Sequence, residues 1–399
     1  MMHRWKTALL CLLWLGTGHG MSQSVRSAAG RAECIGYYTV QLPDAIEYAS
    51  YQNQGGDLSK RLGEGVASLS FSNGDGVRPN KFYVDDGGVL GRTKLIQITQ
   101  PVIQDDLMVI LKKRNIELQK YKIERLEMAK EFSDLPDKQK DVLEQAENIY
   151  FYESFNNGTA IARPYKSEIL GIPGQGSKYE NLINLLTLVD GRIVDVDRAN
   201  LGSSQKTIDT FHKAYSPRAV FDVPTEPGVC LPYGFMRNEK IPAEVSITLR
   251  LKSQPSILIH FEDKPVATGT DAIDAKQFMK NAFRPGRAFA NDDIAPMEVF
   301  DSVHEVAVDG RKGLAGFAKV AHIIDKAKDP KKFRENWGYI AYVPGDKTAA
   351  PGMSSDLILT IERDERFANK EAMTKKEFRE LAINLLASIK RRPSAWKSR

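Results

Sequence analysis

The sequence predicts an α+β fold in two domains, each a mainly antiparallel sheet covered by helices. Three observations lead to this prediction. Stretches with an apolar residue at every second position indicate strands, and stretches with an apolar stripe at helical spacing indicate helices. Residues 223–228 contain two prolines and a glycine and separate the two halves of the chain. A chain of 399 residues is also long enough to form two cores.

The N-terminal residues have the pattern of a secretory signal peptide. Arg4 and Lys6 precede a leucine-rich apolar run, and Gly18 and Gly20 supply the small residues at a cleavage site. The run is shorter than the roughly 20 apolar residues that a membrane span requires. We therefore expect residues 1–20 to be removed and the mature protein to be a soluble protein of the periplasm.

Residues 34–222 are predicted to form an N-terminal α+β domain. A strand is expected at 35–43, which is rich in aromatic and β-branched residues. A long amphipathic helix should begin after residue 106 and end at Leu135-Pro136, where proline interrupts it. A second helix should follow at 137–149, and both helices should cover a sheet.

Residues 223–228 are predicted to be a linker and residues 229–390 a C-terminal α+β domain. From Val245 to Leu251, apolar and polar residues alternate, which is typical of a strand buried on one face. The same alternation at 257–261, after a short turn, predicts an antiparallel hairpin. Further strands are expected at 297–308, 337–343 and 357–363.

A helix is expected to close the C-terminal domain. Thr374 and Glu377 have the spacing of a capping box, and the apolar residues after them recur at helical spacing. Residues 391–399 should then form a basic tail exposed to solvent. The net charge of +5 is too small for this length to indicate a nucleic acid or an anionic membrane as partner.

Two cysteines remain after the predicted signal peptide, Cys34 and Cys230. Thiols tend to pair in an oxidising compartment. A disulfide between them would close a loop of 230 minus 34, or 196, residues. The loop-entropy relation gives such a bridge an upper value of roughly 5 kcal/mol. Two separate, buried, reduced cysteines also fit the sequence, so both states stay open.

No catalytic, cofactor-binding or metal-binding residues are predicted. The segment 171–178 lacks the closing glycine of a nucleophile elbow, and its lysine is displaced from the position that a phosphate loop requires. The histidines beyond residue 20 lack the close spacing of a zinc-binding helix. The sequence therefore predicts a protein that is not an enzyme, without cofactor, metal, nucleic acid or small-molecule substrate, and not embedded in a membrane.

Several short motifs resemble one protein family. The segment from Cys34 to Tyr38 with Leu42-Pro43 resembles the start of the N-terminal domain of the class-four Tle cognate immunity proteins of type VI secretion. The segment from Asp222 to Met236 resembles that family's linker and C-terminal domain opening. Gly310 to Gly316 and Asn336-Trp337-Gly338 are similar to further elements of it.

The resemblance implies a periplasmic immunity protein whose two domains clamp a phospholipase effector and keep it from its lipid substrate. It implies no particular interface residues. Because loops on rigid scaffolds commonly carry recognition, we expect contacts at residues 73–76, 171–176 and 283–293. The alternatives are an exported envelope binding or assembly protein without a toxin partner and a divergent periplasmic hydrolase.

Overall fold

The computed structural model describes most of the chain from residue 30 to residue 392. The described residues are 30–51, 69–73, 75, 83–84, 95–101, 104–147, 151–155, 159–168, 179–199, 204–237, 244–266, 274–283, 294–299, 302–325, 329–346, 355–364 and 373–392. The predicted signal peptide, residues 1–20, lies outside them, as do residues 393–399 of the predicted tail.

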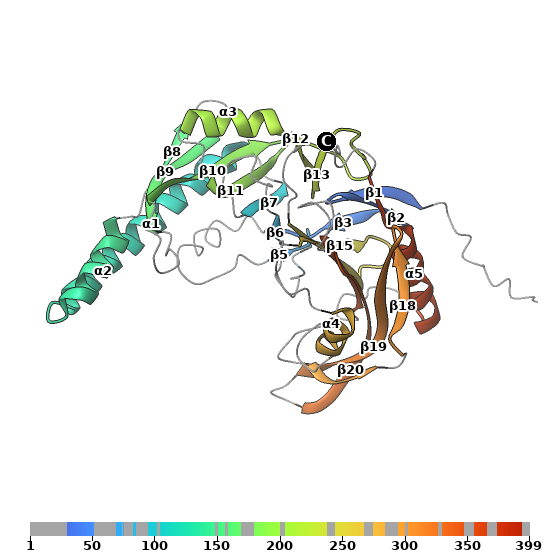
Figure 1. The fold of residues 1–399 in the computed structure, drawn as a ribbon. Helices are drawn as coiled ribbons and strands as arrows, with labels where there is room; N and C mark the ends of the chain where they lie inside the picture. The colour runs from blue at the N-terminus through green and yellow to red at the C-terminus, as the bar shows by residue number, and fades with distance from the viewer. Residues whose placement is uncertain are drawn as a thin grey trace, which may run out of the picture.

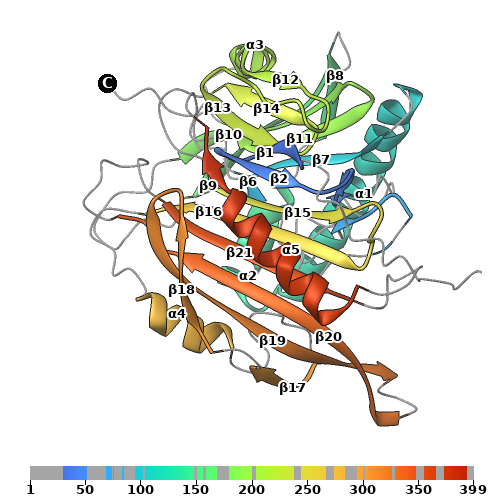
Figure 2. The ribbon, with the colours of Figure 1, turned by 90° about the vertical axis from the view of Figure 1, so that its right-hand side faces the viewer.

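The larger sheet contains most of the C-terminal strands (Figure 2). Its order is β17 (Ile294–Val299), β19 (Arg311–Asp325), β20 (Asp329–Val343), β21 (Ser355–Arg363), β16 (Ile257–Pro265), β15 (Val245–Leu251) and β3 (Ile46–Tyr48). Two strands lie off this path, β18 (His304–Val308) beside β19 and β6 (Tyr83–Val84) beside β15. All of these pairings are antiparallel.

The second large sheet is formed by the middle of the chain (Figure 1). Its order is β5 (Leu69–Ser70), β4 (Ser50–Tyr51), β7 (Leu95–Pro101), β11 (Arg192–Ala199), β10 (Tyr179–Val189), β9 (Thr159–Glu168) and β8 (Tyr152–Phe155). The β4–β7 pair is parallel, and the other pairs are antiparallel.

Two small sheets also form. One consists of β1 (Arg31–Ile35), β2 (Tyr38–Leu42) and β22 (Lys390–Arg391), and the other of β12 (Tyr215–Pro217), β14 (Gly234–Arg237) and β13 (Gly228–Leu231). The first therefore joins the two ends of the described chain. The two small sheets contact each other through β1 and β13.

Five helices accompany the sheets in the described part of the chain. They are α1 (Gln104–Glu131), α2 (Pro136–Glu147), α3 (Ser204–Ala214), α4 (Ala275–Ala282) and α5 (Lys375–Ser388). The first two form an antiparallel pair, and α1 also contacts β8. The helix α3 packs beside β9 and β12. The prediction of two helices separated at Leu135-Pro136 is confirmed, although the first begins at Gln104 and not after residue 106.

The apolar face of the larger sheet explains its contact with α5. The rings of Phe317 in β19 and Trp337 in β20 lie 6.4 and 6.1 Å from the Phe378 ring of α5. The helix also contacts β2, β18 and β21. Figure 2 shows α5 lying across this sheet. The predicted capping box is present, because Thr374 accepts from the Glu377 backbone and Glu377 accepts from the Thr374 backbone. The capping motif thus starts the helix where its apolar stripe meets the sheet.

A tight turn connects β18 to β19 at Asp309-Gly310, where both residues have positive φ. Further along β19, a Cβ on Gly313 would lie 2.4 Å from the Tyr342 carbonyl oxygen. Only glycine allows β19 and β20 to approach so closely at that point.

Several sequence predictions are corrected by the structure. Instead of one strand at 297–308 there are two, β17 and β18. Instead of one strand at 35–43 there is a hairpin of β1 and β2. Arg392, expected in an exposed tail, is 3% exposed and donates to the Pro224 carbonyl at 2.8 Å.

The domains at 34–222 and 229–390 stay a prediction. The strands β3 and β6 come from the range 34–222 but pair with β15 in the range 229–390. A single cluster of buried apolar residues includes Val194 of the seven-stranded sheet and Leu359 of the nine-stranded sheet. The two halves of the chain therefore share strands and a core.

Candidate functional site

A disulfide joins the two halves of the chain. Cys34 in β1 and Cys230 in β13 are bonded, with their α carbons 5.8 Å apart, and both are fully buried. Beside the disulfide, Gly36 and Cys230 exchange two backbone hydrogen bonds, of 3.0 and 2.9 Å. Gly36 has a φ of 57°, a conformation that favours glycine. Of the two states left open by the sequence, the structure has the bonded one.

A buried ion pair lies beside this disulfide. The Arg218 guanidinium lies 2.6 Å from a Glu33 carboxylate oxygen, and both side chains are at most 2% exposed. Arg218 also donates to the Cys34 carbonyl at 2.9 Å and to the Leu231 carbonyl at 3.2 Å. We call Glu33, Cys34, Arg218 and Cys230 the junction. Burial opposes the charge of Arg218, but Tyr48 and Glu33 outweigh it and raise the pKa of Arg218 above its ordinary value.

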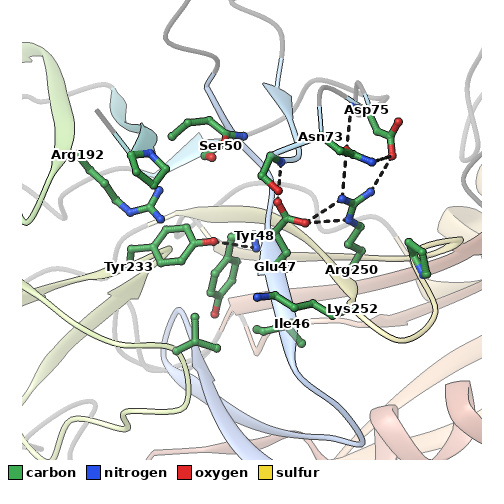
Figure 3. Close-up of a pocket in the computed structure, with 15 residues that line it drawn as sticks. Ile46, Glu47, Tyr48, Ser50, Asn73, Asp75, Arg192, Tyr233, Arg250 and Lys252 are labelled. Atoms are coloured by element: carbon green, nitrogen blue, oxygen red, sulfur yellow. Dashed lines mark hydrogen bonds and ion pairs between the residues drawn. The ribbon is translucent and has the colours of Figure 1, made fainter. Parts of the chain in front are cut away.

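A polar cleft of about 750 Å³ opens next to the junction, between the two large sheets (Figure 3). One wall comes from the nine-stranded sheet, through β3 and Arg250 of β15, and the other from the seven-stranded sheet, through β4, β7 and Arg192 of β11. The rest of the lining comes from loops, through Ser72, Asn73, Asp75, Val220, Tyr233, Lys252 and Pro255. We call this space the inter-sheet cleft.

Arg250 organises one side of the inter-sheet cleft. Its guanidinium lies 2.8 Å from Glu47 and 2.8 Å from Asp75, and it donates to the Asn73 side chain at 3.2 Å. Its charge also lies over the Phe71 ring, 4.0 Å from the centroid. Burial acts to raise the pKa of Glu47, but hydrogen bonds from Ser72 and the charge of Arg250 outweigh it, so the pKa is lowered. One arginine therefore binds both carboxylates on this side, and it favours the ionised form of Glu47.

Arg192 and Tyr233 form the opposite side. The guanidinium carbon of Arg192 lies 3.5 Å from the Tyr233 ring centroid, and Arg192 donates to the Thr99 carbonyl at 2.9 Å. Burial lowers the pKa of Arg192, although Tyr233, Tyr215 and Asp190 act in the opposite direction. A cation stacked on a ring in this way gains an attraction that does not neutralise its charge.

Local sequence places both side chains. Asp190 and Gly191 have φ of 49° and 67° and form the turn of the β10–β11 hairpin, so that Arg192 opens β11 at its edge with β7. Tyr233, with a φ of 58°, lies in the turn between β13 and β14. A Cβ on the next residue, Gly234, would lie 2.4 Å from the Tyr215 hydroxyl, so the turn packs closely on β12.

The three loops predicted to carry recognition have three different outcomes in the structure. Asn73 and Asp75, from residues 73–76, line the inter-sheet cleft. Residues 171–176 lie outside the described part of the chain, and of residues 283–293 only Phe283 is described, packed beside α4 and Gly316. Arg192, Tyr233 and Arg250 were not predicted to belong to a site. The Asp-Gly pair at 190–191, flanked by apolar runs, was a signal that could have revealed the hairpin.

A hydroxyl, an imidazole and a carboxylate also meet on the nine-stranded sheet. The His260 ring nitrogens lie 2.8 Å from the Thr248 hydroxyl and 2.9 Å from a Glu262 carboxylate oxygen. Burial opposes ionisation of Glu262, but His260 and Lys264 outweigh it and lower its pKa to about 2. The Thr248 hydroxyl belongs to a residue that is only 3% exposed, and none of the three residues lines the inter-sheet cleft. Their hydrogen bonds satisfy one another across β15 and β16.

Within the described residues, no cluster of three or more histidine, cysteine or acidic side chains is arranged to hold a metal ion. None of the helices among those residues is both long enough and apolar enough to cross a bilayer.

No protein-family model matches this chain, and no curated protein matches it in sequence. Solved structures of type VI secretion immunity proteins do resemble it in fold. Two are of the immunity protein TplEi from Pseudomonas aeruginosa, one bound to an "L" peptide and one without ligand. Each has 13% identity and a TM-score of 0.45, and the matches cover 92% of this chain and 99% or 98% of TplEi.

A third is the Tle4–Tli4 complex, with 13% identity, a TM-score of 0.46, and coverage of 92% of this chain and 99% of the matched one. A likeness at this level establishes neither the family nor the function of this chain.

Proposed function

We propose that this chain is an immunity protein of a type VI secretion system that binds a phospholipase effector in the periplasm and inhibits it by occupancy. The inhibitor needs no nucleophile, acid or base of its own. It needs two rigid surfaces held at a fixed separation, so that the effector is blocked from its lipid substrate when it is bound between them.

The junction is the observation that carries the proposal. The motifs that resemble the immunity family begin at Cys34 and at Asp222, far apart in the sequence. In the folded chain these motifs meet, through the Cys34–Cys230 disulfide and the paired backbones of Gly36 and Cys230. Short motifs that match by chance have no reason to converge, whereas motifs that determine a shared fold do.

The disulfide also supports an exported protein. Structural disulfides form and persist in oxidising compartments and are rare in the cytosol. The bond is fully buried, which is expected of a structural bridge and not of a reactive redox pair. The periplasm is the compartment that fits both this bond and the signal-peptide pattern of residues 1–20.

The inter-sheet cleft supports binding between two surfaces. Stable protein complexes bury roughly 1,200–2,000 Å² in total, more than the walls of one cleft supply. An effector segment in the inter-sheet cleft would therefore also contact the rims of both sheets.

We expect the gene beside the one for this chain to encode a lipase, and the test uses that lipase. The lipase is directed to the periplasm of a bacterial host, alone or with the full-length chain, and survival is measured. We expect the full-length chain to protect and a variant without residues 1–20 to fail, because the lipase acts outside the cytosol. Purified mature chain should also abolish lipid hydrolysis at an equimolar ratio. Unchanged hydrolysis together with no complex in gel filtration would refute the proposal.

A further inference from the structure

The charges that line the inter-sheet cleft do not balance. The lining contains three basic residues, Arg192, Arg250 and Lys252, and two acidic residues, Glu47 and Asp75, which leaves one positive charge in excess. Arg250 binds both carboxylates, at 2.8 Å each. Arg192 and Lys252 are therefore the cations of the lining that Glu47 and Asp75 do not neutralise.

Arg192 lacks a carboxylate partner among the residues that the structure describes, where none lies within 4.0 Å of its guanidinium. Asp190, in the turn before it, is close enough to favour the charged form but not to form an ion pair. The contacts that hold Arg192 are the Tyr233 ring and the Thr99 carbonyl. These contacts fix its orientation and leave its full positive charge inside a cleft.

The position of Arg192 favours a carboxylate ligand. A guanidinium is planar and presents paired donors that match the two oxygens of a carboxylate. Partial burial strengthens such a pair, because water screens it less than at an open surface. Stacking on Tyr233 orients the guanidinium before binding, so that less side-chain entropy is lost when a ligand arrives.

We propose that the inter-sheet cleft receives an acidic side chain on a loop of the partner protein, and that this carboxylate pairs with Arg192 over the Tyr233 ring. The inference rests on the proposed function and names the chemistry by which its site recognises the partner. Lys252, on the opposite wall, also lies close enough to Asp44 to lower the pKa of that carboxyl, so Arg192 is the cation that the proposal depends on.

The deciding experiment measures the dissociation constant of the lipase for the full mature chain and for Arg192→Gln. We expect Arg192→Gln to weaken binding by about 30-fold or more, because a partly buried charge in the partner is left without its counter-ion. This loss of affinity should be smaller at high salt, because salt already weakens the ion pair in the wild type. Arg192→Lys should lose less affinity than Arg192→Gln, because lysine keeps the positive charge although it lacks the paired donors of a guanidinium.

Arg237→Gln is the matched control, because Arg237 is 47% exposed, pairs with Glu226 and does not line the inter-sheet cleft. Its affinity should equal that of the wild type. Thermal unfolding of each variant shows whether Arg192→Gln remains folded. A folded Arg192→Gln that binds within about twofold of the wild type overturns the inference and leaves the proposed function intact.

If the wild-type chain does not bind the lipase at all, the proposed function fails, and the inference is decided by a hexaglutamate peptide with hexaglutamine as control. The inference is supported if the wild type binds hexaglutamate but not hexaglutamine, and if Arg192→Gln does not bind hexaglutamate. Equal binding of both peptides, or of neither, overturns it. Binding of phosphatidylglycerol vesicles that depends on Arg192 would also overturn it, in favour of a lipid headgroup.

Discussion

Arg218 at the junction is buried and Arg192 in the inter-sheet cleft is partly buried, and the two differ in what balances their charge. Arg218 has the Glu33 carboxylate at 2.6 Å and donates to several backbone carbonyls. Arg192 lies over the Tyr233 ring and donates to the Thr99 carbonyl. No carboxylate in the described part of the chain lies within ion-pair distance of it. A buried cation whose partners are all internal holds a fold together, whereas one that lacks a counter-ion is available to a ligand.

The largest effect should come from breaking the junction at Arg218. We expect Arg218→Leu to lower the free energy of unfolding by about 3–5 kcal/mol, because it leaves the Glu33 carboxylate buried without its partner. Chemical denaturation monitored by circular dichroism measures this loss. Arg237→Leu, at an exposed ion pair, should cost less than about 1 kcal/mol. Similar losses for the two variants would contradict the contrast between buried and exposed arginines.

The disulfide should rank next. We expect Cys34→Ala with Cys230→Ala to lower the free energy of unfolding by about 2–5 kcal/mol, because the bridge closes a loop of 196 residues in the unfolded chain. Denaturation of the wild type in the presence of a reductant should give the same midpoint as the double variant. If oxidised and reduced wild type unfold at the same denaturant concentration, the bridge does not stabilise the junction.

The smallest effect should appear in the inter-sheet cleft, as a dependence of stability on pH. The folded-state pKa of Glu47 lies below its ordinary value, so the ionised carboxylate stabilises the fold. This stabilisation is fully present above the unfolded-state pKa and is lost as the pH falls through the folded-state pKa. Between about pH 6 and pH 3 we therefore expect the wild type to lose about 1 kcal/mol more than Glu47→Gln.

Unfolding free energies measured across this pH range test the prediction. Glu226→Gln is the control, because Glu226 pairs with Arg237 at the surface and its side chain is 54% exposed. That variant should follow the wild-type slope. If Glu47→Gln follows it as well, Glu47 is not held by Arg250 and Ser72 as the structure indicates.

The hairpin of β15 and β16 shows what local pattern predicts well. Alternation of apolar and polar residues predicted both strands and the turn between them, and the structure pairs Ile247 with Phe261 and Leu249 with Ile259. The alternation did not predict that the polar face would be covered too. Ser246, Thr248 and Arg250 are buried along with their apolar neighbours, since side chains from other elements pack over them.

The segment from β9 to β11 shows where such prediction stops. These strands were not predicted, although Asp190-Gly191 between two apolar runs is a strong hairpin signal. The helix α4 was not predicted either. The helix has only 8 residues, so its apolar stripe is short. Met279 is buried in a cluster with Ile340 and Tyr342, which come from a strand far along the chain.

The sequence alone determined the elements whose signals are local: the capped helix α5, the helix pair divided at Leu135-Pro136 and the hairpin of β15 and β16. It also supplied the two cysteines, without deciding whether they bond. Only the tertiary structure decided that Cys34 meets Cys230 and that Arg192 lies over Tyr233 beside the cleft. Those contacts depend on the pairing of strands that are far apart in the sequence. The residues next to each one along the chain do not specify that pairing.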